Sequence, residues 1–165
     1  LGFQTFIIEK EQDEGRDISS SYIREELQNG NIGKANELLG SVYSVEGIVE
    51  RGNHIGGSIL GFPTVNLSVP EGKLLPRHGV YETETQLPYG SWVRGITNVG
   101  TNPSVKEDRQ HHRARIETFL LTYSGELYDQ RICVRFLRFL RPELKFDSLD
   151  ALKEQIQRDI QSIGS

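Results

Sequence analysis

The sequence predicts a mainly β domain in which six short strands form an antiparallel barrel or sandwich, with helices before and after it. Six segments alternate apolar and polar residues, turns containing Gly or Pro separate them, and no helical pattern lies between them. Strands without interleaved helices favour an antiparallel sheet over a parallel α/β sheet. The 165 residues suit one domain with a sizeable core, or one domain and a fragment of another.

The first forty residues are polar and are predicted to be mostly helical. Ser20 or Ser21 can cap the start of one helix, and Gly30 suits its end. A second, shorter helix is predicted to close at Gly40. The predicted elements of this part are a strand at 5–10, a charged loop at 11–17 and helices at 19–30 and 34–40.

The period-two segments follow, and a final helix ends the chain. Asp147 or Ser148 can cap this helix, which is predicted over 146–164. Its apolar residues recur at helical spacing: Leu149, Leu152, Ile156, Ile160 and Ile163. The predicted strands are 43–50, 63–69, 79–85, 91–99, 115–123 and 131–139.

Composition narrows the class of protein. A net charge of −4 argues against a nucleic-acid-binding protein, and the short apolar runs predict no membrane span. Cys133 is the one cysteine, so no internal disulfide can form, and a reducing compartment, the cytoplasm, is expected. The chain contains no Met, and we expect it to be cut from a longer polypeptide.

Thr64 and Asn66 are the first candidates for chemistry. In a strand they share one face with Ser68, while Val65 and Leu67 share the other. A half-buried strand with a wet polar face explains this pattern. Alternatively, the hydroxyl and amide oxygens, side by side, are the hard neutral ligands that Mg²⁺ favours.

Glycines before this strand suggest a phosphate-binding loop. Glycine lets the backbone approach a ligand closely, so that N–H groups can converge on phosphate oxygens. The loop is not a Walker A motif, because it lacks the Lys and leads into a strand. A flexible hairpin loop remains the alternative. The glycines are Gly52, Gly56, Gly57 and Gly61.

Glu117 is predicted to share a strand face with Phe119 and Leu121, an unusual place for a carboxylate. If partly desolvated, it would be a stronger base toward a hydroxyl proton. Alternatively, it is a Glu on an edge strand that pairs with Arg113 or Arg115.

A neighbouring basic segment, 109–115, gathers three arginines with His111 and His112. It could attract phosphates, but adjacent histidines are poorly spaced for a shared metal, and we expect a solvated loop. Cys133 lies in an apolar strand and is expected to be a core residue.

Five segments, in order, resemble the riboflavin kinase family, in particular the kinase module of the bacterial bifunctional enzymes that also make FAD. These segments are GFPTVNL, GVYET, GITNVGTNPSV, IETFLLTYSGELYDQ and FLRPELKFDSLDALKEQIQRDI. Upstream, ISSSYIREELQNGNIGKANELLG resembles the end of the adenylyltransferase domain of those enzymes. The resemblance covers nearly the whole chain.

The resemblance implies a six-stranded antiparallel Greek-key barrel with a C-terminal helix. It implies a remnant of the FMN adenylyltransferase domain with linker helices at 1–40 and a riboflavin kinase domain at 41–165. The implied reaction transfers the ATP γ-phosphate to the riboflavin 5′-hydroxyl and gives FMN. The parent protein would also adenylate FMN, whereas this chain alone is expected not to.

Site roles also follow from the resemblance. Thr64 and Asn66 match residues that hold Mg²⁺ and phosphates, and Glu117 matches the general base. Tyr128 matches a position near the nucleotide, and Arg141 matches a residue on the flavin side. The implied flap over the nucleotide comprises Gly52, Gly56, Gly57, Ser58, Gly61 and Pro63.

Three departures from the family pattern leave other functions open. Ser58 lies near the usual place of a flap Arg, Phe119 replaces a usual His, and the usual Asp before the turn that follows Tyr123 is missing. A flavin-binding or regulatory module with impaired catalysis is therefore the alternative. Base rates alone leave a plain interaction barrel as a third hypothesis.

Overall fold

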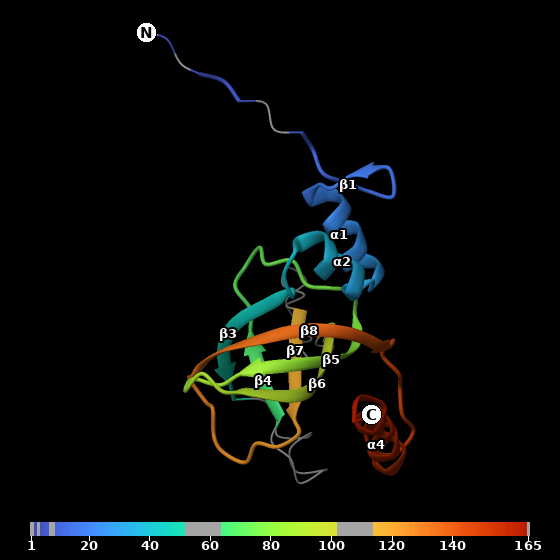
Figure 1. Cartoon of the computed structure of the whole chain (residues 1–165). Helices are drawn as coiled ribbons and strands as arrows, with labels where there is room; N and C mark the ends of the chain where they lie inside the picture. The colour runs from blue at the N-terminus through green and yellow to red at the C-terminus, as the bar shows by residue number, and fades with distance from the viewer. Residues whose placement is uncertain (1, 3, 7–8, 52–63, 102–113, 165) are drawn as a thin grey trace, which may run out of the picture.

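The computed structural model describes residues 2, 4–6, 9–51, 64–101 and 114–164. Six antiparallel strands close into a barrel, two helices pack beside strand β8, and a C-terminal helix lies alongside the barrel (Figure 1). Of the two architectures that the sequence left open, the barrel is therefore confirmed. All six predicted strand segments form strands.

The barrel order is β3-β4-β7-β6-β5-β8. Three consecutive strands, β5, β6 and β7, form a meander, and β8 returns to lie beside β5, which is the Greek-key arrangement. The same closure brings β4 beside β7. The strands are β3 (Ser44–Glu50), β4 (Thr64–Ser68), β5 (Gly79–Gln86), β6 (Trp92–Thr101), β7 (Ala114–Leu120) and β8 (Arg131–Arg141).

Alternate residues of the strands fill the barrel interior. Val45, Val65, Ile116 and Phe136 belong to this buried cluster. Three buried threonines cross the interior from β5 to β7: the hydroxyls of Thr83 and Thr97 lie 2.8 Å apart, and those of Thr97 and Thr118 2.9 Å apart. Each hydroxyl thus finds a partner away from water, which burial of a polar group requires.

Two predictions for the N-terminal part were wrong. The predicted loop at 11–17 contains a hairpin, β1 (Gln12–Asp13) and β2 (Arg16–Asp17), whereas residues 5, 6, 9 and 10 lie outside strands. The residues between the two strands, Glu14 and Gly15, have φ angles of +50° and +81°. This left-handed pair is the turn that two-residue hairpins favour, so it lets β1 pair with β2.

Helices α1 (Ser20–Asn29) and α2 (Ile32–Leu39) end at Gly30 and Gly40, as predicted. The predicted cap of α1, Ser20 or Ser21, was wrong: the N-cap is Ser19, whose hydroxyl accepts the Tyr22 N–H. Leu27, Ile32 and Ala35 belong to the same buried cluster as the barrel interior. The two helices are therefore part of the barrel's core.

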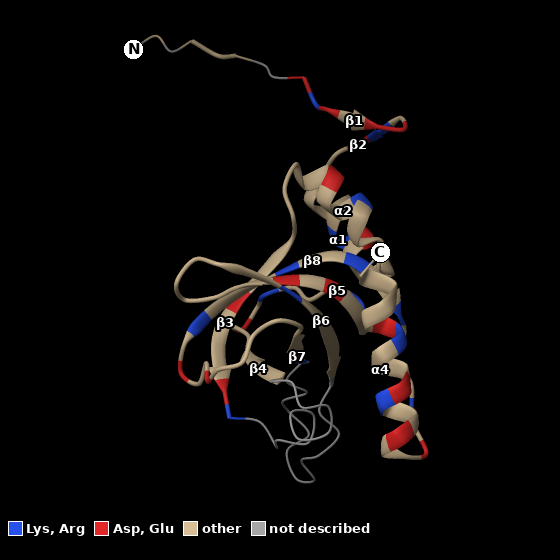
Figure 2. Cartoon of the chain, turned by 60° about the horizontal axis from the view of Figure 1, so that its bottom comes forward, with Lys and Arg blue, Asp and Glu red and all other residues tan. Residues whose placement is uncertain are grey.

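Helix α4 (Leu149–Ile163) begins after Ser148, whose hydroxyl accepts the Ala151 N–H, so the predicted cap is confirmed. Ile163 packs with Phe119 and two further apolar side chains on the outer face of the barrel. Acidic and basic residues follow one another along α4 (Figure 2). The helix thus covers an apolar patch of the barrel and keeps its charges toward water, apart from Asp159, which is buried.

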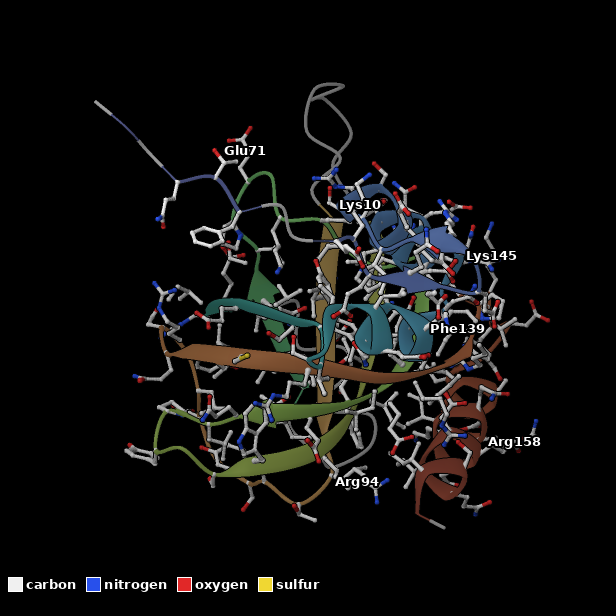
Figure 3. The ribbon with its side chains drawn as sticks, turned by 45° about the horizontal axis from the view of Figure 1, so that its top comes forward. Lys10, Glu71, Arg94, Phe139, Lys145 and Arg158 are labelled. Carbon is white, nitrogen blue, oxygen red and sulfur yellow. The ribbon has the colours of Figure 1, made fainter. Side chains whose placement is uncertain are left out.

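A buried carboxylate holds the end of α4 against the sheet. Glu82, whose side chain is 10% exposed, accepts from Arg94 Nη2 at 2.5 Å and from Arg138 Nε at 3.0 Å. Arg94, which is labelled in Figure 3, also donates to the Ile163 carbonyl, and Arg138 donates to the Ser162 carbonyl. These carbonyls lack partners within the helix, so the arginines cap its C-terminus.

Candidate active site

The three side chains expected to carry the chemistry lie on the adjacent strands β4 and β7. Asn66 is directly opposite Glu117 in the ladder, and Thr64 is opposite Phe119. Val65 and Leu67 are buried inside the barrel, so Thr64 and Asn66 face outward, as the alternation predicted. Opposite residues have Cβ atoms about 5 Å apart, so the fold brings Asn66 and Glu117 into contact range although 50 residues separate them.

Arg115 joins these two side chains. Its Nε donates to Asn66 Oδ1 at 2.8 Å, and its Nη2 donates to the same oxygen. Nη2 also lies 3.5 Å from Glu117 Oε2, with side chains that are 32% and 28% exposed. The expected pairing of Glu117 with Arg115 is thus present, but β7 is not an edge strand, because the closed barrel pairs it with both β4 and β6.

A third strand extends this polar row. Asn98 on β6 is the other ladder partner of Glu117. Its amide donates to Glu143 Oε1 at 3.1 Å. Sequence reasoning missed both the contact of Arg115 with Asn66 and the place of Asn98, because strand order decides both. The outer face of the barrel therefore carries Asn66, Glu117 and Asn98 side by side across three strands.

Comparison with known proteins decides the family. Residues 39–165 match the family model "Flavokinase: Riboflavin kinase". The chain belongs to the riboflavin kinase family. The matched residues include β4, β7 and all the side chains of the candidate site described above.

Curated relatives extend the match upstream of this riboflavin kinase domain. The "Bifunctional riboflavin kinase/FMN adenylyltransferase" of Bacillus subtilis is 37% identical over 155 residues, which are 94% of this chain and 48% of that protein. The Escherichia coli K12 protein of the same name is 37% identical over 142 residues, 86% of this chain and 44% of that protein. The chain thus spans about half the length of the curated relatives it matches.

A solved structure has the same fold. The protein named "Macrolide-efflux Protein" from Streptococcus pneumoniae superimposes with a TM-score of 0.83 and is 32% identical, over 92% of this chain and 48% of that one. Within the residues described here, no helix is long and apolar enough to cross a membrane.

Two other predicted site residues, Tyr128 and Arg141, lie outside the three strands that carry the polar row of Asn66, Glu117 and Asn98. Tyr128, in the connection between β7 and β8, packs against the core, and the Arg51 guanidinium lies 5.5 Å from its ring centroid. Arg141, at the end of β8, is held against α4: its guanidinium contacts both carboxylate oxygens of Asp159 at 2.8–3.1 Å. The flap residues Gly52, Gly56, Gly57, Ser58, Gly61 and Pro63, together with Arg113 and both histidines of 109–115, lie outside the described residues.

The donor set of the riboflavin kinase domain fits a magnesium ion. Thr64 and Asn66 offer a hydroxyl and an amide oxygen on one strand face, and the Glu117 carboxylate lies across the ladder. These are hard oxygens, two of them neutral, which leaves positions for phosphates and water. No cluster of three His, Cys, Asp or Glu side chains suited to a metal occurs among the residues that the structure describes.

Proposed function

We propose that this chain is an ATP-dependent riboflavin kinase that phosphorylates the 5′-hydroxyl of riboflavin and releases FMN and ADP. One observation carries the proposal: Asn66 and Glu117 face each other across the β4–β7 ladder, with Thr64 on the same face. The match of residues 39–165 to the riboflavin kinase family supports the choice of substrates.

Thr64 Oγ1 and Asn66 Oδ1 are proposed to hold Mg²⁺. When bound, the ion neutralises charge on the ATP phosphates, which phosphoryl transfer needs more than it needs covalent help. The two side chains fix the position of the nucleotide's phosphates over β4, because the strand backbone holds them rigidly.

Glu117 is proposed to accept the proton of the 5′-hydroxyl. The new bond joins the hydroxyl oxygen to the γ-phosphorus, the bond from that phosphorus to the β–γ bridging oxygen breaks, and ADP leaves. Because Glu117 is opposite Asn66, a hydroxyl hydrogen-bonded to its carboxylate lies beside a phosphate held at β4. A base in this position typically contributes about 10²–10⁴-fold to the rate.

The remaining residues are proposed to surround the substrates. Tyr128 is proposed to contact the nucleotide, and the six flap residues named above are proposed to bind its phosphates. Arg141 is proposed to lie on the flavin side, and its ion pair with Asp159 holds α4 in place. The pairing is nearly buried, with side chains 16% and 6% exposed, which supports a positioning role.

The parent protein is proposed to combine two activities, as the names of its relatives state. Residues 1–40 would be the end of an adenylyltransferase domain with its linker helices, and 41–165 the kinase domain. The docking of α1 and α2 into the barrel core supports close contact between the two parts. We also propose a cytoplasmic location and no nucleic-acid or membrane partners. The net charge of −4 supports the proposal that the chain does not bind nucleic acid.

One experiment separates the candidate functions. The chain is incubated with riboflavin, ATP and Mg²⁺, and FMN is measured by chromatography, with FMN supplied in place of riboflavin in a parallel sample. The proposal predicts FMN in the first sample and no FAD in the second. Quenching of riboflavin fluorescence without FMN formation would support the flavin-binding module instead. The absence of both quenching and FMN formation would support the interaction barrel.

A further inference from the structure

Arg115 is a charged side chain at the candidate site that the mechanism above does not use. Its guanidinium donates through Nε and Nη2 to Asn66 Oδ1 and lies 3.5 Å from Glu117 Oε2. One cation therefore contacts both the proposed metal ligand and the proposed base. The Arg115 side chain is 32% exposed, so most of it lies against the barrel.

This contact conflicts with metal binding at Asn66. The amide oxygen that would bind a divalent ion accepts two N–H groups from a cation. A metal ligand must lie about 2.0–2.1 Å from Mg²⁺, so the guanidinium and the ion would share one oxygen at close range. The two N–H groups occupy both lone pairs of this oxygen, and the two positive charges repel each other, so Asn66 must release Arg115 before its oxygen can serve as a ligand.

The released guanidinium needs an acceptor nearby. Its backbone stays fixed in β7, so the side chain can move only within the reach of its own stem. The planar fork of donors matches phosphate oxygens, and a guanidinium beside a transferring phosphoryl group stabilises the charge that spreads over its oxygens. The ATP phosphates, brought to Thr64 and Asn66, would place such oxygens within this reach.

We propose that Arg115 is a phosphate-binding residue that exchanges partners when the nucleotide enters. Without nucleotide it holds Asn66 and Glu117; with nucleotide it binds the phosphates. The exchange frees Asn66 Oδ1 to act as a ligand and Glu117 Oε2 to accept a hydrogen bond from the hydroxyl. This inference rests on the proposed kinase function, because it needs the nucleotide at this face.

An exposed ion pair that contributes nothing is the competing explanation, because many surface pairs have no measurable effect. Arg115 differs from such a pair because it makes three contacts with two proposed site residues, and all three side chains are half-buried. The matched control is Arg131 on β8, which is such an exposed pair: its side chain is 67% exposed, and its Nη1 lies 4.0 Å from Glu46 Oε2.

The test measures equilibrium binding of the non-hydrolysable ATP analogue AMP-PNP with Mg²⁺, and of riboflavin, which has no phosphate. Arg115→Gln is expected to weaken AMP-PNP binding about 10- to 100-fold, the loss of a charge-assisted hydrogen bond, and to leave riboflavin binding unchanged. Arg115→Lys keeps the charge without the fork and should lose less. Arg131→Gln should bind both ligands as the wild type does.

A second readout follows the partner exchange itself. In the wild type, the Arg115 Nε–H resonance, assigned by its absence from the Arg115→Lys spectrum, should shift on addition of AMP-PNP with Mg²⁺ and not on addition of riboflavin. Unchanged or tighter AMP-PNP binding in Arg115→Gln, or equal weakening for both ligands, would overturn the inference. A wild-type chain that binds no AMP-PNP would overturn the proposed function as well.

Discussion

Replacing Arg141 by methionine tests how α4 is attached to the barrel. The guanidinium contacts Asp159 through Nε at 3.0 and 3.1 Å and through Nη2 at 2.8 Å, and the two side chains are 16% and 6% exposed. In Arg141→Met, the Asp159 carboxylate stays buried, and the Gln155 amide, which donates to it at 2.9 Å, does not neutralise its charge.

The expected cost follows from this burial. Removing one partner of a buried pair destabilises a protein by about 3–5 kcal/mol, because an uncompensated charge remains. In a chain of 165 residues, each kcal/mol lowers Tm by about 2–4 °C, so the variant should melt about 6–20 °C below the wild type. The assay is urea unfolding followed by circular dichroism, with thermal melting alongside it.

Two further variants separate charge burial from other effects. In the double variant Arg141→Met/Asp159→Leu, no charge is buried, and most of the lost stability should return. Arg158→Met removes an ion pair with Glu154 in which the two side chains are 68% and 67% exposed. This change should cost less than about 0.5 kcal/mol of stability. The reasoning is refuted if Arg141→Met is as stable as the wild type, or if the double variant is no more stable than the single one.

Three other variants test electrostatic features of the fold. Glu82→Gln should lower the free energy of unfolding in urea by about 1–3 kcal/mol, because two arginines lose their shared carboxylate. The control Glu84→Gln, on the same strand face, should lose little, and equal losses in the two variants would contradict this. The hydrogen bond from Lys34 holds the pKa of Asp13 below its usual value, so stability should fall as the pH drops below about 4. Asp13→Asn should reduce that slope in an acid titration of unfolding, and an unchanged slope would contradict the assignment. Burial raises the pKa of Tyr81 from 10.0 to about 12, so stability should fall as the pH rises from about 10 to 12. Tyr81→Phe should flatten that fall, and an unchanged slope in the variant would contradict the assignment.

Periodicity was sufficient to locate the strands and helices of the barrel. Alternation along Thr64–Ser68 also predicted which side chains face outward, because side-chain direction in a strand depends only on parity. Cap positions were less certain: with three consecutive serines, the sequence could not distinguish Ser19 from its neighbours as the cap of α1, since all three have the same side chain. Local pattern does not reveal the β1–β2 hairpin, because its turn pair, Glu14 and Gly15, lies within a run of charged residues.

Contacts between distant segments could not be predicted from local pattern. The pairing of β4 with β7 decides that Arg115 contacts Asn66, and alternation within either strand carries no information about it. The pair of Arg141 with Asp159 likewise depends on where α4 docks. The identities of Thr64 and Glu117 as site candidates came instead from their chemistry and from family resemblance.

The measurement that tests the central claim most directly is the turnover of Glu117→Gln against riboflavin binding by the same variant. If the carboxylate on β7 accepts the hydroxyl proton, kcat for FMN formation should fall by about 10²–10⁴, while riboflavin affinity stays within error of the wild type. Glu126→Gln, an exposed glutamate in the β7–β8 connection, is the matched control and should turn over normally. Near-normal kcat in Glu117→Gln would contradict the account.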